Sequence, residues 1–125
     1  IHSTWIGLAF ERLCLLHADQ IKEALRIGGV HANIHAWRSP HAQIDLLIDR
    51  DDGIINLCEM KFASDEFEVT AGEDRDMKRK IAELKKLSGT RKSIHVTYVT
   101  TYGLKENSYA KEVQSSVDLD GLFYR

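Results

Sequence analysis

The chain has 125 residues, of which 43% are hydrophobic and 29% charged, and its formal net charge at pH 7 is -2. This length suits one domain with a substantial core, and this composition excludes a disordered tail. No apolar run approaches the length that spans a bilayer and no secretory leader is visible, so we expect no membrane segment. Cys14 and Cys58 have neither disulfide-like nor metal-like spacing, which suits a reducing cytoplasm. Because the chain begins at Ile1 rather than Met, we expect it to be part of a longer protein.

The first segment of the chain predicts a long helix. Ser3 or Thr4 can cap its N-terminus, and Gly28-Gly29 is expected to end it after about Arg26. Four apolar residues and one histidine recur on one face at helical spacing: Phe10, Cys14, His17, Ile21 and Leu25.

The middle of the chain predicts three extended segments. Residues 33–37 form a short one, followed by a loop that contains Pro40. Residues 44–49 and 54–62 are rich in Ile and Leu and are separated by a charged turn, which predicts an antiparallel hairpin. The second of these segments is apolar at both alternating positions, as expected for a central strand covered on both faces.

The second half of the chain predicts one helix and one buried strand. Residues 66–69 fit a short extended piece, and residues 72–87 predict a charged helix with apolar residues at helical spacing. The β-branched residues 94–100 predict a buried strand, whereas residues 107–117 fit a helix or a strand equally well. The order α-β-β-β-α-β predicts a single α/β domain, a central mixed sheet flanked by helices.

Three charged side chains on the predicted hairpin could meet in one place. Glu59 and Lys61 lie two residues apart and therefore share a face of their strand. A two-residue turn at Asp52-Gly53 would place Asp45 opposite Met60, on the other face. A three-residue loop at residues 51–53 would instead place Asp45 opposite Glu59, and its last residue, a glycine, suits the left-handed conformation of such loops. We predict the three-residue loop, in which both carboxylates can reach one ion.

These residues resemble the PD-(D/E)XK nuclease superfamily, with Asp45 as the first acid and Glu59-Met60-Lys61 as the (D/E)XK element. The chain is most similar to the nuclease-like C-terminal domain of prokaryotic P-loop ATPases of the archaeal type. One departure from the family pattern is that Ile44, not proline, precedes Asp45. The segments that carry the resemblance are residues 7–14 (GLAFERLC), 43–50 (QIDLLIDR), 56–62 (NLCEMKF), 100–104 (TTYGL) and 119–123 (LDGLF).

The resemblance implies a restriction-endonuclease-like core and Mg²⁺- or Mn²⁺-dependent cleavage of DNA. It assigns the cation to Asp45, Glu59 and the backbone carbonyl of Met60, and it gives Lys61 the task of positioning the attacking water and stabilising negative charge. Glu11 matches an acidic residue that completes the site in many relatives. The chain contains no G-x-x-x-x-G-K-[ST] phosphate loop, so an ATPase module is expected N-terminal to this domain in the same protein.

The charge pattern gives two readings of nucleic-acid binding. The net charge does not mark a DNA-binding protein, yet residues 73–92 hold eight basic residues against four acidic ones. Lys78 and Lys80 are the candidates for contact with substrate, although ion pairs along a solvated helix explain the same pattern. Likewise, Glu59 and Lys61 could form a solvated ion pair on an exposed strand face, with Asp45 as a strand-entry cap. The alternative function is an inactive nuclease fold that regulates, docks or binds DNA for its ATPase, with these three residues as structural remnants.

Overall fold

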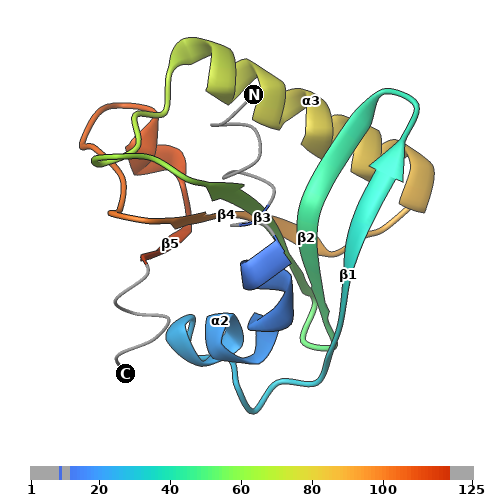
Figure 1. The fold of residues 1–125 in the computed structure, drawn as a ribbon. Helices are drawn as coiled ribbons and strands as arrows, with labels where there is room; N and C mark the ends of the chain where they lie inside the picture. Colours follow the sequence, from blue (N-terminus) through green and yellow to red (C-terminus); the bar gives the residue numbers. More distant parts are fainter. Residues whose placement is uncertain (1–8, 10–11, 119–125) are drawn as a thin grey trace.

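The computed structural model describes residue 9 and residues 12–118, and these form a mixed five-stranded sheet flanked by helices (Figure 1). The strand order follows the sequence, β1-β2-β3-β4-β5. The first two pairings are antiparallel and the last two are parallel. The strands are β1 (Ala32–Ser39), β2 (Ala42–Arg50), β3 (Ile54–Lys61), β4 (Ser93–Thr100) and β5 (Ser115–Asp118). The predicted α/β class is therefore confirmed.

Helix α3 (Ala71–Ser88) covers one face of the sheet and links the parallel strands β3 and β4. Its start is fixed by Thr70, whose hydroxyl accepts a hydrogen bond from the backbone N–H of Glu73 at 3.2 Å. Its end is fixed by Gly89, which adopts a left-handed φ of 64°. The bounds agree with the predicted helix at residues 72–87.

Helix α2 (Ala18–Ala24) covers the opposite face, and its end differs from the prediction. Residues 12–16 are also helical, but the helix is interrupted by a turn at His17. The chain leaves α2 at Arg26, which has a φ of 62°, while the backbone N–H of Ile27 donates to the carbonyl of Lys22. Arginine thus takes the left-handed position that glycine usually occupies, and Gly28-Gly29 lies beyond the end of the helix.

Two short segments complete the sheet. Pro40 lies in a tight turn between β1 and β2, where the Ser39 hydroxyl accepts hydrogen bonds from the next two available backbone N–H groups. The segment that fitted helix or strand contains both, a short 3₁₀ helix η1 (Ala110–Glu112) followed by β5. The predicted extended piece near residue 67 is a single parallel bridge between Phe67 and Leu104.

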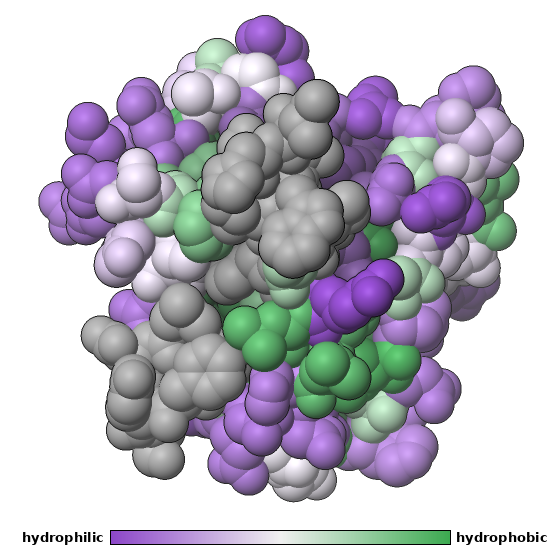
Figure 2. All heavy atoms as spheres, in the orientation of Figure 1, coloured by the Kyte–Doolittle hydropathy of each residue, from purple (hydrophilic) through white to green (hydrophobic). Residues whose placement is uncertain are grey.

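Two hydrophobic cores lie on the two faces of the sheet, so β3 is buried on both sides as predicted. The core beneath α2 consists of Cys14, Ile21, Ile27, Leu46, Ile48, Cys58, Met60 and Val99. The core beneath α3 consists of Ile44, Leu47, Ile55, Leu57, Val69, Met77, Leu84 and Tyr98. Figure 2 shows hydrophobic atoms on the surface near α2, and Leu15 and Leu16, which precede α2, are exposed. Among the described residues, no helix combines the length and apolar character needed to cross a membrane.

Candidate metal centre on the β2–β3 hairpin

The turn between β2 and β3 has the predicted length. The chain turns through residues 51–53, and Gly53 has a left-handed φ of 88°. The pairings Leu46 with Cys58 and Leu47 with Leu57 fix the register of the two strands. The three-residue loop is therefore confirmed. The strand pairing ends at Leu46 and Cys58, so Asp45 and Glu59 are the next residues of the two strands, and their direct opposition stays a prediction.

A β-bulge lies in β2 at Asp45 and Leu46. The paired residues of β1 advance from His35 to Trp37, a step of two, while their partners in β2 retreat from Leu47 to Ile44, a step of three. Two residues of β2 therefore face one residue of β1. The bulge shifts the side-chain alternation, because Ile44 and Leu47 both pack in the core beneath α3. Bulges commonly redirect a side chain or end strand pairing, and here both effects fall at Asp45.

The carboxylate of Asp45 is directed at the backbone of β3. Its Oδ2 atom accepts a hydrogen bond from the N–H of Met60 at 3.1 Å. In a strand, the N–H and C=O of one residue point to the same neighbouring strand. The carbonyl of Met60 therefore also faces the β2 side, where the paired ladder has ended. The Asp45 carboxylate and the Met60 backbone thus lie together at the open end of the hairpin, next to Glu59 in the sequence.

Glu59 is a buried carboxylate with a basic partner on α3. The residue is 3% exposed, and its Oε1 atom lies 2.6 Å from the Nζ of Lys80. Its Oε2 atom lies 4.0 Å from the Nζ of Lys61. Burial raises the pKa of Glu59, and the charge of Asp45 adds to that increase, whereas the two lysines oppose it. The carboxylate is thus held in a place where additional positive charge would stabilise its ionised form.

Lys61 shares the face of Glu59 and is the last residue of the central strand β3. Its Nζ is 3.5 Å from Oε1 of Glu73, on the first turn of α3, and 5.7 Å from the centre of the Phe67 ring. Its side chain is 29% exposed, whereas that of Glu59 is only 4% exposed. Lys61 can therefore reach solvent and a bound anion, which Glu59 cannot do without a bridging group.

An open cavity of about 370 Å³ borders the Asp45 end of the site. It is lined by Leu15, Ala36, Trp37, Arg38, Gln43, Ile44 and Asp45. Arg38 is exposed and lies on the same wall as the acidic residue, so the cavity offers a cationic group for an anionic ligand. Neither Arg38 nor Gln43 was predicted as a site residue. Arg38 comes near Asp45 only through the pairing of β1 with β2, whereas Gln43 lies two residues before Asp45 on the same strand.

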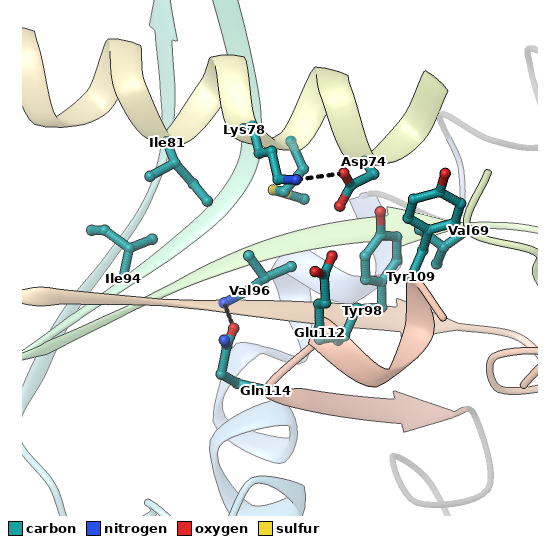
Figure 3. Close-up of a pocket in the computed structure, with 12 residues that line it drawn as sticks. Val69, Asp74, Lys78, Ile81, Ile94, Val96, Tyr98, Tyr109, Glu112 and Gln114 are labelled. Carbon is teal, nitrogen blue, oxygen red and sulfur yellow. Dashed lines mark hydrogen bonds and ion pairs between the residues drawn. The ribbon is translucent and has the colours of Figure 1, made fainter. Parts of the chain in front are cut away.

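The two lysines predicted for substrate contact lie in different places. Lys80 faces Glu59 and is 3.8 Å from Asp76 on its own helix. Lys78 pairs with Asp74 at 2.8 Å and lines a second cavity of about 210 Å³ between α3, β4 and the η1 segment (Figure 3). The sequence signal for both lysines was the basic character of residues 73–92, and it did not predict the contact of Lys80 with Glu59. Ion pairs along the helix, the alternative explanation of that pattern, are present at Lys78 and Lys80.

The second cavity contains a buried hydroxyl group. Tyr98 is 1% exposed, and none of the described residues provides a hydrogen-bond partner for its Oη atom. The side chain rises from β4 towards α3, near Asp74 and Tyr109 (Figure 3). Its ring stacks on Phe67 with centroids 5.8 Å apart, and burial raises its pKa. Nothing in the sequence marked this residue beyond its place in a predicted buried strand.

The oxygen atoms at the hairpin suit a hard divalent cation. Mg²⁺ is usually bound by one or two carboxylates with water completing the shell, which matches Asp45, Glu59 and the carbonyl of Met60. The described residues include no group of three or more His, Cys, Asp or Glu side chains that could hold a metal ion. A cation here would therefore depend on two carboxylates, the backbone and water. Glu11, the expected fourth site residue, lies outside the described residues.

Comparisons with known proteins support the fold alone. No family model and no curated protein matches the chain. A solved structure entitled "Crystal Structure of Protein of Unknown Function AF1548" is similar, with a TM-score of 0.53 and 16% sequence identity. The similarity covers 82% of this chain and 56% of the other, so this chain spans little more than half of that protein. The described part of this chain therefore has an α/β fold shared with a longer protein.

Proposed function

We propose that this domain hydrolyses phosphodiester bonds in DNA with Mg²⁺ or Mn²⁺ as cofactor. The observation that supports this function best is the hydrogen bond from the Met60 N–H to Asp45, which holds this carboxylate beside the strand that carries Glu59 and Lys61. Asp45, Glu59 and the Met60 carbonyl would hold the cation. When bound, such an ion polarises the scissile phosphate and makes a coordinated water more acidic.

The protein's own groups have separate tasks in this proposal. The hydrogen bond from the Met60 N–H to Oδ2 holds the Asp45 carboxylate against the backbone of β3. The other oxygen, Oδ1, would bind the cation. The ammonium of Lys61, held near Glu59 and Glu73, would donate to a phosphate oxygen as negative charge develops there. Arg38 would contact the phosphate backbone from the cavity beside Asp45.

A nicking assay on supercoiled plasmid with Mg²⁺ or Mn²⁺ tests this function. We expect the parent protein to convert plasmid to the nicked form. Lys61→Ala should lose most of that activity, because the variant lacks the lysine ammonium group that would stabilise the transition state. Lys85→Ala is the matched control, since Lys85 is an exposed lysine on α3. Equal cleavage by the parent and Lys61→Ala would contradict the proposed role.

A second candidate function is favoured by the ion pair between Glu59 and Lys80. This pair already satisfies one oxygen of the buried carboxylate without a metal, as expected for a nuclease fold that serves a P-loop ATPase in regulation, docking or DNA binding. Inactivity of both parent and Lys61→Ala, in the presence of the full-length protein and ATP, would support this candidate. In either case we propose a cytoplasmic location, where Cys14 and Cys58, which form no disulfide, would stay reduced.

A further inference from the structure

Lys80 is bound to Oε1 of Glu59, one of the two carboxylate oxygens that a metal ion at the hairpin could use. The ion pair between Lys80 Nζ and Glu59 Oε1 is 2.6 Å long, and the two side chains are 13% and 4% exposed. Two such buried groups stabilise each other strongly, because neither can be left unpaired without a large desolvation cost. Lys61 is less close to Glu59, at 4.0 Å from the other oxygen. Lys80 is therefore the main counter-ion of Glu59.

A divalent cation and the Lys80 ammonium cannot share this oxygen at low cost. Both carry positive charge, and their repulsion is strong in a site that is shielded from water. Lys80 has a second acidic neighbour, since Oδ2 of Asp76 lies 3.8 Å from its Nζ, four residues earlier on α3. The other oxygen of Asp76 is bound by Arg79, which holds this carboxylate beside the lysine.

We propose that Lys80 is an internal counter-ion that keeps Glu59 paired in the cation-free protein and moves to Asp76 when a divalent cation binds. Lys80 is thus a positioning residue that lowers the affinity of the site for metal and protects the buried carboxylate when metal is scarce. This assignment rests on the proposed cation site, but it concerns binding rather than cleavage.

Calorimetric titration with Mn²⁺, together with thermal unfolding with and without Mn²⁺, tests the proposal. Lys80→Met removes the competing charge and keeps a side chain of similar length, so we expect about tenfold tighter binding of Mn²⁺. Without metal this variant should unfold at a lower temperature than the parent, and Mn²⁺ should raise its Tm by more than it raises that of the parent. Lys78→Met is the matched control, because Lys78 pairs with Asp74 away from Glu59, and it should bind Mn²⁺ as the parent does.

Two further variants separate the possible outcomes. Lys80→Gln retains a hydrogen-bond donor to Glu59 without the charge, so it should also bind Mn²⁺ more tightly than the parent. It replaces Lys80→Met in the test if Lys80→Met does not fold. Asp76→Asn removes the negative charge to which Lys80 would move, so it should weaken Mn²⁺ binding. Unchanged or weaker binding in the folded Lys80 variants, or no Mn²⁺ binding by parent or variants, would overturn the proposal. Tighter Mn²⁺ binding by the Lys80 variants without plasmid cleavage would support the counter-ion role of Lys80 and refute nuclease activity. Plasmid cleavage by the parent with unchanged Mn²⁺ binding in the variants would support nuclease activity and refute the counter-ion role.

Discussion

The buried hydroxyl of Tyr98 has no hydrogen-bond partner among the described residues, which makes the replacement Tyr98→Phe a sharp test of the structure. A buried polar group without a partner costs about 1–3 kcal/mol, and phenylalanine removes it while keeping the ring. The stacking on Phe67, at 5.8 Å between centroids, should persist because it depends on the ring alone. We therefore expect Tyr98→Phe to stabilise the cation-free protein by about 1 kcal/mol.

Urea denaturation at pH 7 measures this gain directly, and thermal unfolding should show a Tm increase of about 3 °C for a domain of this size. Tyr109→Phe is the matched control, since Tyr109 lines the same cavity but is only half-buried. Its replacement should change the stability by less than about 0.5 kcal/mol. A loss of stability in Tyr98→Phe would refute the reasoning, because it would mean that the hydroxyl has a partner such as an ordered water molecule.

Three other properties follow from the structure. Arg26→Gly should raise the free energy of unfolding by about 0.5–1 kcal/mol, because the φ of 62° at Arg26 is a left-handed conformation that glycine adopts more readily. Urea denaturation measures this change. As the control, Gln20→Gly within α2 should lower the free energy of unfolding by about 1 kcal/mol. The buried thiol of Cys58, whose pKa is raised chiefly by burial, should not react with a thiol reagent at pH 8 until urea unfolds the protein, and rapid labelling of the native state would contradict this. Burial and the charge of Asp45 raise the pKa of Glu59 above its ordinary value of 4.5. The folded state therefore keeps the Glu59 carboxyl protonated to a higher pH than the unfolded state does. The stability that this protonation provides falls as the pH rises above 4.5. Asp45→Asn should make that decline shallower in urea titrations from pH 4 to 8, and an unchanged slope would show that the two carboxylates do not interact.

Local rules account for the parts of the hairpin that the sequence predicted correctly. Gly53 tolerates the left-handed turn at no steric cost, so the loop length and the register of β2 against β3 followed from turn chemistry. The burial of β3 on both faces followed from its lack of alternation. The nuclease activity and the metal remain predictions, since the similar solved structure supports only the fold.

The parts that the sequence did not predict depend on contacts between distant segments. Arg26 ends α2 although glycine is the usual residue there, because tertiary packing outweighs a local preference of about 1 kcal/mol. The pairing of Lys80 with Glu59 joins residues that are 21 positions apart, through the crossover that places α3 over the sheet. The bulge at Asp45 could not be predicted, since it depends on how β1 aligns with β2.

The extra residue of β2 divides this strand into two parts with different phase. From Leu46 onwards β2 keeps step with β3, whereas from Ile44 backwards it keeps step only with β1. A change in the length of the β1–β2 turn would therefore alter only the pairing of β1 with β2. The register of β2 against β3 would stay the same. Loss of one residue at the phase boundary would have the opposite effect, because it would rejoin the two parts and rotate one of them to the other side of the sheet.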